Sequence, residues 1–310
     1  MVEAHIPHLE IPIGRLDIDQ GSELWKAFIP KVREACERHG CFFLKCDKFM
    51  PMNLFEEMFK ALESLFHLPE ETKRKYTNPN LFHGYLSTPL VSTYESFGIN
   101  GTTHLDVAQA FTNLMWPDGN SNFFEVLNTM SSKMLELNLI ILKLIFESFH
   151  MKNYYRLHCE NNSGIFRMIK YKVPASNDSP IGLVPHTDKN FLTILCDNEV
   201  HGLEILCKDT IWAPLMIPKG SFIVFVGDSL KAWSNGRLHA VKHRVMMREK
   251  KVRYSCGLFL TPKEGVNVEV PEKLVDEDHP LLYKPFNYSD FMAFFASNYC
   301  EEALQVYAGA

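Results

Sequence analysis

His186-Thr187-Asp188-Lys189-Asn190-Phe191-Leu192-Thr193 is the stretch that decides the fold of this 310-residue chain. Its histidine and its carboxylate stand two residues apart, directly before an apolar run. Residues i and i+2 of an extended chain point to the same face, so His186 and Asp188 can bind one ion. A third ligand must come from another strand, and both His239 and His243 are available for it. The stretch therefore predicts a metal site between strands that face one another.

Short apolar runs separated by turn residues continue through the second half of the chain. They are rich in Ile, Val, Phe and Leu, and this spacing is typical of an antiparallel sandwich or barrel. The runs cover residues 165–172, 191–196, 203–206, 222–226, 241–246 and 254–260.

The first half of the chain has a helical pattern instead. Its clearest helix covers residues 121–149, where apolar residues recur at three- and four-residue steps. Ser22 is expected to cap an earlier helix that Gly40 ends, and Pro30 to bend or interrupt that helix. We therefore expect an α+β fold in one compact unit, since no linker separates the halves. Further helices are expected over 52–66, from 69 onward and over 288–299, with a short buried strand over 41–44.

Composition and charge narrow the class of protein. The formal net charge is −5 and there is no basic stripe, which argues against nucleic acid as a partner. The chain starts without a charged-then-apolar leader, and its most apolar helical stretch (135–149) is too short and too polar to span a membrane. The eight cysteines show no Cys-x-x-Cys spacing and are expected as reduced core residues. A cytoplasmic monomer is the expectation.

Arg253-Tyr254-Ser255 repeats the spacing of the first motif. Arg253 and Ser255 share a face of an extended strand, so a guanidinium and a hydroxyl can converge on one carboxylate. A surface arginine on an edge strand is the alternative for the triplet alone, but an apolar run follows it directly. Two histidines and one carboxylate with open positions suit Fe(II), whereas a structural zinc would have four protein ligands. Together the motifs indicate an oxygen-activating enzyme.

These motifs resemble those of the plant iron(II)- and 2-oxoglutarate-dependent dioxygenases. Residues 35–43 and 68–73 also match the N-terminal part of that family, so the resemblance covers nearly the whole chain. Within the family, Asp188-Lys189-Asn190 together with residues 233–239 looks most like the AOP-type branch, which acts on specialised metabolites. The matching spans of the second half are 186–193, Gly227-Asp228-Ser229-Leu230, 233–237, His243-Arg244-Val245 and Arg253-Tyr254-Ser255.

The resemblance implies a fold and a set of ligands. The fold would be a double-stranded β-helix (jelly-roll) core over residues 156–310, including a C-terminal helix, packed on a helix-rich region over residues 1–155. The family's second metal histidine directly precedes Arg-Val, which selects His243 over His239 as the partner of His186 and Asp188. The 2-oxoglutarate would be bound by Arg253, Ser255 and Tyr171, although Ile169 replaces the family's usual asparagine two residues before that tyrosine.

The resemblance also implies a reaction. The cofactor and co-substrates would be Fe(II), 2-oxoglutarate and O2, with ascorbate as reductant. The enzyme would oxidise, most often by hydroxylation, an unactivated C–H bond of a small plant specialised metabolite and release succinate and CO2. Related halogenases lack the carboxylate ligand, so Asp188 argues against halogenation. Two alternatives stay open: a phytohormone oxidase acting on a gibberellin or an auxin, and a non-catalytic member that binds a small molecule.

The substrate pocket is apolar by the same resemblance. The last helix is expected to close over it, and plain core packing is the alternative role for each of its phenylalanines. The residues expected to line the pocket are Phe166, Leu183, Phe191, Phe225, Phe259 and Phe295.

Overall fold

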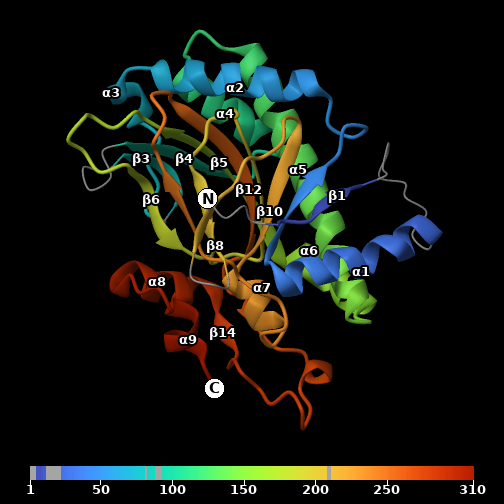
Figure 1. Cartoon of the computed structure of the whole chain (residues 1–310). Helices are drawn as coiled ribbons and strands as arrows, with labels where there is room; N and C mark the ends of the chain where they lie inside the picture. The colour runs from blue at the N-terminus through green and yellow to red at the C-terminus, as the bar shows by residue number, and fades with distance from the viewer. Residues whose placement is uncertain (1–4, 12–21, 81, 88–92, 208–210) are drawn as a thin grey trace.

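Two β-sheets form the centre of the computed structural model, which describes residues 5–11, 22–80, 82–87, 93–207 and 211–310 (Figure 1). The larger sheet has the strand order β1-β2-β10-β7-β12-β5-β4-β3, and the smaller sheet the order β6-β11-β8-β9. The larger sheet comprises β1 (His8–Glu10), β2 (Cys41–Lys45), β3 (Gly84–Ser87), β4 (Tyr94–Asn100), β5 (Asn162–Tyr171), β7 (Leu192–Asp197), β10 (Ser221–Val226) and β12 (Arg253–Pro262). The smaller sheet comprises β6 (Ile181–His186), β8 (Leu203–Leu206), β9 (Trp212–Pro214) and β11 (His243–Met246), and β13 (Asn267–Val268) pairs with β14 (Phe286–Asn287).

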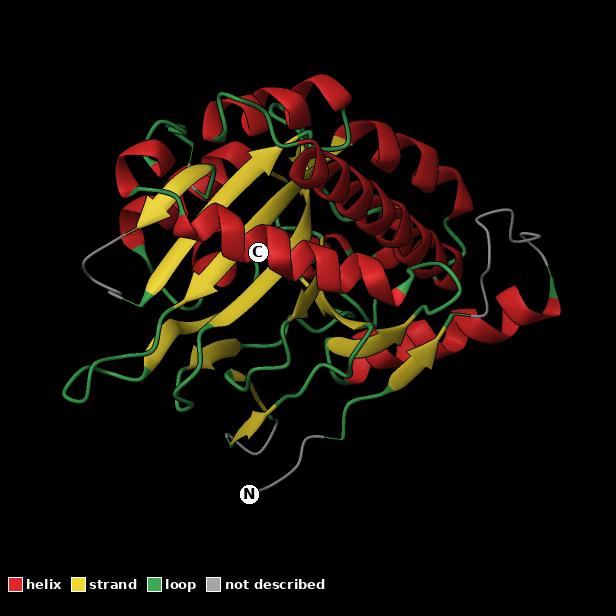
Figure 2. Ribbon diagram, turned by 90° about the horizontal axis from the view of Figure 1, so that it is seen from above, coloured by secondary structure: helices red, strands yellow, loops and turns green. Residues whose placement is uncertain are grey.

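Helices cover one face of the larger sheet (Figure 2). The long helix α5 (Ser121–Ser148) contacts β7 and β12 of the sheet and the helices α1, α2, α4 and α6. Asn138, buried on α5, donates a hydrogen bond to the backbone carbonyl of Leu258 at 3.2 Å, which ties the helix to β12. The other helices are α1 (Glu23–Arg38), α2 (Met52–His67), α3 (Glu70–Lys73), α4 (Leu105–Met115), α6 (Lys152–Asn161), α7 (Asp228–Trp233), α8 (Tyr288–Asn298) and α9 (Ala303–Ala308).

Strand β5 shows that the two faces of the larger sheet differ. Phe166 and Met168 belong to the apolar cluster that includes the buried side of α5. Ile169 and Tyr171 belong to a second cluster, which also contains residues of β8 and β11 and therefore lies between the two sheets. Because successive side chains of a strand alternate, even positions of β5 face the helices and odd positions face the interior.

Most of the expected elements are present, and the α+β jelly-roll prediction is confirmed. Ser22 caps α1 by accepting a hydrogen bond from the Trp25 amide at 3.2 Å. Helix α1 continues through Pro30, so of the two expected effects, a bend or an interruption, the interruption does not occur. The buried side of the helix, which includes Phe28 and Val32, packs against α5.

The front half contributes strands as well as helices. β2 pairs with β10, and β4 pairs with β5, so the first region is hydrogen-bonded into the same sheet as the second. The division of the chain near residue 155 stays a prediction. Strand β6, which carries His186, was not expected because Pro180, Gly182 and Pro185 interrupt its apolar pattern.

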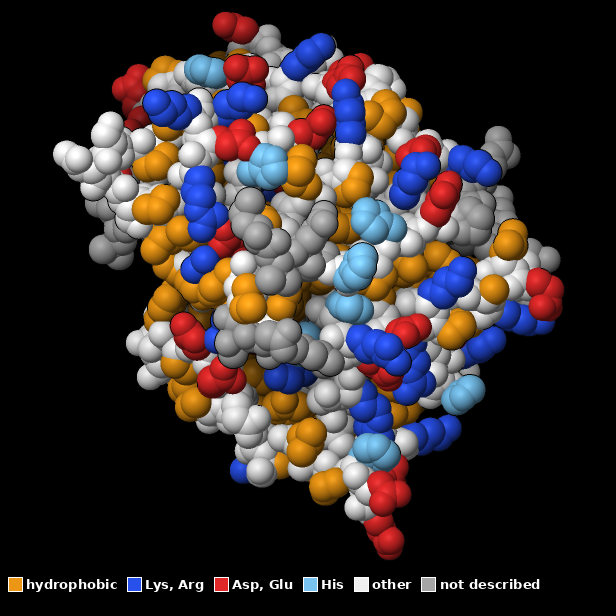
Figure 3. Space-filling view, viewed as in Figure 1, with side chains coloured by type: hydrophobic (Ala, Val, Ile, Leu, Met, Phe, Trp, Pro, Cys, Tyr) orange, Lys and Arg blue, Asp and Glu red, His pale blue; other side chains and the backbone are white. Residues whose placement is uncertain are grey.

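The surface carries both signs of charge. Figure 3 shows Lys and Arg side chains interleaved with Asp and Glu over the face drawn there. Within the described ranges, none of the helices combines the length and the apolar character needed to cross a bilayer.

Candidate metal centre

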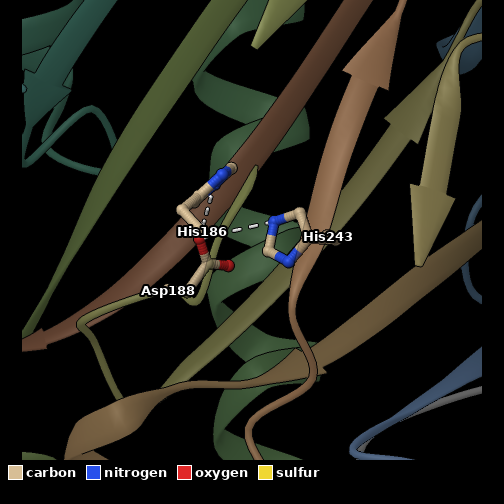
Figure 4. A group of neighbouring side chains, drawn as sticks. All are labelled: His186, Asp188 and His243. Carbon is tan, nitrogen blue, oxygen red and sulfur yellow. Dashed lines mark ion pairs between the residues drawn. The ribbon is translucent and has the colours of Figure 1, made fainter. Parts of the chain in front are cut away.

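Three side chains converge at one end of the smaller sheet (Figure 4). His186 ends β6 and His243 begins β11, and the two residues stand opposite each other in the antiparallel pairing of these strands. One carboxylate oxygen of Asp188, Oδ1, lies 3.7 Å from Nε2 of His186 and 3.8 Å from Nε2 of His243. One ligand atom from each residue lies within 4.8 Å of the others. The structure thus brings together the three residues that the sequence predicts as metal ligands.

Backbone carbonyls orient both histidine rings. Nδ1 of His186 lies 2.8 Å from the carbonyl of Val184, and Nδ1 of His243 lies 3.2 Å from the carbonyl of Val241. A ring nitrogen bonded to a carbonyl must carry the proton, which leaves the lone pair on Nε2 for a metal ion. Phe225 stacks on the His243 ring with centroids 4.4 Å apart and an interplanar angle of 11°. Both rings therefore present Nε2 toward Asp188.

The charge states at the site are those of metal ligands. Burial, followed by the nearby His243, lowers the pKa of His186 to about 3, so its imidazole is neutral near pH 7. Burial by itself raises the pKa of Asp188, but the two histidines and a hydrogen bond from Thr193 outweigh it, and the pKa falls below its usual value. Thr193 Oγ1 donates to Asp188 Oδ2 at 2.6 Å, which leaves Oδ1 for the site. A neutral imidazole and an ionised carboxylate are the forms that coordinate divalent cations.

A buried ion pair holds the loop that carries Asp188. The Lys189 ammonium donates to Asp228 Oδ2 at 2.7 Å, and Thr187 Oγ1 donates to the same oxygen at 2.9 Å. A Cβ atom on Gly227 would lie 2.0 Å from the carbonyl oxygen of Asn190, so this close approach requires glycine. The pairing of Lys189 with Asp228 was not predicted, because their 39-residue separation gives no sequence signal.

Arg253 and Ser255 lie in the interior, next to Tyr171. The Arg253 side chain is 1% exposed, and its guanidinium carbon lies 5.3 Å from the Tyr171 ring centre. Arg253 Nε and Ser255 Oγ are buried and have no hydrogen-bond partner among the described residues. Buried polar atoms are nearly always paired, so these two atoms fit the carboxylate of a bound ligand. The residues present are therefore chemically suited to 2-oxoglutarate.

The sequence did not indicate Asp197 as a residue of the site. Arg253 Nη2 donates to Asp197 Oδ2 at 2.7 Å, and both side chains are buried. Asp197 stands directly opposite Ser255 in the pairing of β7 with β12, so all three residues share the interior face. This pair fixes the guanidinium in place while leaving Nε available. Only the strand register reveals it.

His239 lies apart from the metal centre. Its amide donates to the Cys36 carbonyl at 3.0 Å, and a Cβ on Gly40 would lie 2.3 Å from the His239 carbonyl oxygen. His239 thus packs at the end of α1, where it lines a cavity of about 680 Å³ together with Arg38 and Lys242.

Three of the expected pocket residues lie on the interior side. Phe225 contacts His243, and Leu183 packs against the cluster between the sheets. Phe259 is partly buried on β12 and has the same parity as Ser255, so it shares the interior face.

The other three expected pocket residues belong to the cluster that includes the helices. Phe166 lies on the face of β5 opposite to Tyr171, and Phe191 packs against the His158 ring of α6 with centroids 5.4 Å apart. Phe295 on α8 is also part of that cluster, but its ring lies 4.8 Å from the Lys189 ammonium and so borders the metal loop.

Two family models match the chain. Residues 150–262 match the 2OG-Fe(II) oxygenase superfamily, and residues 11–125 match the family described as non-haem dioxygenase in morphine synthesis N-terminal. The jelly-roll fold and the His-Asp-His cluster define the same class of protein, a 2-oxoglutarate-dependent dioxygenase. The chain belongs to the 2OG-Fe(II) oxygenase superfamily.

Relatives narrow the position within that family. The chain is 42% identical to a probable 2-oxoglutarate-dependent dioxygenase AOP1 of Arabidopsis thaliana, over 90% of this chain and 93% of the relative. The crystal structure of the rice dioxygenase for auxin oxidation is similar with a TM-score of 0.82 and 31% identity, covering 98% of this chain and 100% of that one. The Arabidopsis thaliana dioxygenase for auxin oxidation 1, in its 2-oxoglutarate complex, has a TM-score of 0.79 and 29% identity, covering 89% and 99%. The AOP-type resemblance is thus confirmed.

Proposed function

We propose that this dioxygenase oxidises, most often by hydroxylation, an unactivated C–H bond of a small plant specialised metabolite, with release of succinate and CO2. The convergence of His186, Asp188 and His243 supports this proposal, since these residues present two imidazoles and one carboxylate to a single point. The AOP-type resemblance, which implies a specialised metabolite as substrate, supports this choice, and the chain is 42% identical to an AOP1 relative.

The residues of the chain have separate roles in this proposal. His186, Asp188 and His243 would hold Fe(II) through two imidazole nitrogens and one carboxylate oxygen. Arg253 and Ser255 bind the distal carboxylate of 2-oxoglutarate, and Tyr171 packs beside it. When bound, the iron supplies the activation of O2 that the side chains cannot perform. The protein's own contribution is to orient both substrates and to exclude water from a buried site.

Succinate release tests the proposal directly. The protein is supplied with Fe(II), ascorbate, O2 and 2-oxoglutarate, and a panel of plant metabolites is screened for substrate-dependent succinate and for a product with altered mass. Asp188→Ala is the matched inactive control. We expect at least one metabolite to give both signals with the wild type alone. Normal binding of metal and 2-oxoglutarate without turnover of any metabolite would contradict the proposed substrate class.

Oxidation of an auxin is the second candidate function. The similarity to the rice dioxygenase for auxin oxidation over 98% of the chain favours it. The same assay with indole-3-acetate decides between the two candidates, because only an auxin oxidase converts it with coupled succinate release at low concentration.

Three further features belong to the proposal: the chain acts as a monomer, in the cytoplasm, with ascorbate as reductant. Light scattering on the purified protein should give the mass of one 35.8 kDa chain. Omission of ascorbate should shorten the time over which turnover continues, and a fluorescent fusion should distribute through the cytosol.

A further inference from the structure

Arg167 is a buried cation that the roles described above do not use. It lies on β5 and is 9% exposed. Its Nη2 donates to the Tyr94 hydroxyl at 2.6 Å and lies 3.4 Å from Ser96 Oγ, while Nε is buried without a partner among the described residues. Hydroxyl groups are neutral partners, so these contacts do not balance the charge of the guanidinium.

The other buried cations of the described chain all have a carboxylate partner. Lys73 pairs with Glu95, Lys189 with Asp228 and Arg253 with Asp197, each at 2.7 Å. No carboxylate of a described residue lies within 4.0 Å of Arg167, which sets it apart from those three pairs. An unpaired charge in a protein interior is strongly unfavourable, and a ligand with a negative group would offset that cost.

Glycines flank Arg167 in the sheet. Arg167 stands directly opposite Gly98 of β4 and Gly257 of β12, so the two positions directly across from it carry no side chain. The rings of Phe82 and Phe259 flank the guanidinium, with their centroids 4.9 Å and 5.4 Å from its central carbon. The result is a buried guanidinium between two aromatic rings, beside the hydroxyl groups of Tyr94 and Ser96.

Gly98 also fixes the position of Phe82. A Cβ on Gly98 would lie 1.9 Å from the Phe82 carbonyl oxygen, so only glycine lets this loop lie against the sheet. Phe82 itself has a φ of 67°, a left-handed conformation that is unfavourable for an aromatic residue.

Arg167 shares the interior face with the proposed 2-oxoglutarate site. Positions 167 and 171 of β5 have the same parity, and four residues of extended chain separate them by about 13 Å. Burial raises the pKa of Tyr171, and the charges that also act on it include those of Arg253, Arg167 and Asp188. The two guanidinium groups have different partners, since Arg167 donates to Tyr94 and Arg253 donates to Asp197.

We propose that Arg167 binds the carboxylate of the substrate that is oxidised, and that Phe82 and Phe259 contact the apolar body of this substrate. This inference rests on the proposed function and narrows it to organic acids with an apolar ring or chain. The enzyme then has two anion sites on one sheet face: Arg253 for the co-substrate and Arg167 for the substrate.

Binding of acids and their amides tests this assignment. The protein is loaded with Mn(II) and 2-oxoglutarate, so that no turnover occurs. Calorimetry then compares indole-3-acetate, 1-naphthylacetate, cinnamate and cyclohexanecarboxylate, each with its primary amide. If Arg167 forms a charge-assisted hydrogen bond with the carboxylate, each acid that binds should bind at least about tenfold more tightly than its amide. Equal affinities within each pair, or binding of none of the four acids to the loaded protein, would overturn the proposal.

Variants separate recognition from structure. Arg167→Gln should reduce acid affinity to that of the amide, leave amide affinity unchanged and leave 2-oxoglutarate affinity unchanged. Arg167→Lys keeps the charge and should retain part of the preference for the acid, even if the Gln variant fails to fold. Lys170→Gln is the matched control, because it removes a positive charge that lies on the opposite face of β5. This variant should behave as wild type. If a folded Arg167→Gln variant still prefers acids over amides, the assignment of Arg167 is wrong. If the wild-type protein does not bind Mn(II) or 2-oxoglutarate at all, the proposed function is wrong instead.

Discussion

The two faces of the larger sheet are built from the same strands but carry different kinds of side chain. On the helix-facing side, Phe166 and Met168 of β5 are fully buried in an apolar core. On the interior side, Arg167 and Tyr171 of the same strand lie among polar atoms, several of them buried without partners. Among the described residues, the outer face leaves only neutral oxygens such as Asn138 Oδ1 without a partner, whereas the inner face leaves nitrogens of two guanidinium groups, Arg167 and Arg253, unpartnered. That difference indicates that the outer face stabilises the fold and the inner face binds ligands.

Removal of a metal ligand should have the largest effect on the inner face. Asp188→Ala deletes the oxygen that faces both histidines, so Fe(II) or Mn(II) affinity should fall by more than about a hundredfold, since even outer residues of metal sites contribute ten- to a hundredfold. Calorimetric titration of the metal measures this. Asp276 has an exposed side chain, so the Asp276→Asn variant serves as the control. If Asp188→Ala keeps its metal affinity, the metal centre lies elsewhere.

Removal of a large side chain from the outer face should change stability alone. Phe166→Ala should lower the free energy of unfolding by about 3–5 kcal/mol, because it leaves a cavity in a close-packed core. Chemical denaturation with urea measures the loss. Metal affinity of the folded fraction should stay at the wild-type value, and a selective loss of metal or substrate binding would mean that Phe166 contributes to the pocket after all.

The proposed co-substrate site should respond to Arg253→Ala. The substitution leaves Asp197 without its partner and removes the predicted contact with 2-oxoglutarate, so 2-oxoglutarate binding should weaken by about 2–5 kcal/mol. Competition between 2-oxoglutarate and a fluorescent analogue, in the presence of Mn(II), measures the change. Mn(II) affinity in the absence of 2-oxoglutarate is the internal control. An unaltered 2-oxoglutarate affinity would show that Arg253 does not bind 2-oxoglutarate.

Acid should destabilise the outer face through His158. Burial among aromatic rings lowers the pKa of His158 to about 4 from its usual 6.5. Between these two values the unfolded chain binds a proton that the folded chain does not, so stability falls as the pH drops through this window. This one group contributes at most about 1.4 kcal/mol per pH unit. His158→Gln should flatten the dependence in urea titrations at pH 7, 5.5 and 4.5, and an identical slope would contradict the shift.

His239→Ala should have the smallest effect. His239 lies at the end of α1 and is not among the three residues whose ligand atoms converge, so metal affinity should change by less than about twofold, within the range of substitutions away from a site. The same titration as for Asp188→Ala measures it. A loss of metal with His239→Ala, together with its retention in His243→Ala, would reverse the ligand assignment.

Local patterns in the sequence predicted what depends on local spacing. The two-residue spacing of His186 and Asp188 predicted their common face, and the apolar steps over 121–149 predicted α5. The choice between His239 and His243 needed the family resemblance, because both positions have the same parity on an extended strand. Parity also carried a signal that was not used: Phe166 and Tyr171 differ in parity, which places them on opposite faces of β5.

Features that depend on register were beyond the sequence. The pairing of Arg253 with Asp197 and the two glycines beside Arg167 become visible only when β7, β12, β5 and β4 are aligned. The buried link between Lys189 and Asp228 requires β6 and α7 to meet in space. Strand β6 was missed because Gly182 and Pro185 obscure the alternation that normally marks a strand.

A crystal structure of the protein with Mn(II) and 2-oxoglutarate tests the central claim most directly. The account predicts that the metal is coordinated by Nε2 of His186, Nε2 of His243 and the carboxylate of Asp188. It also predicts that the distal carboxylate of 2-oxoglutarate is hydrogen-bonded to Arg253 and Ser255. A metal bound away from these three side chains, or a 2-oxoglutarate whose distal carboxylate lies far from Arg253, would contradict it.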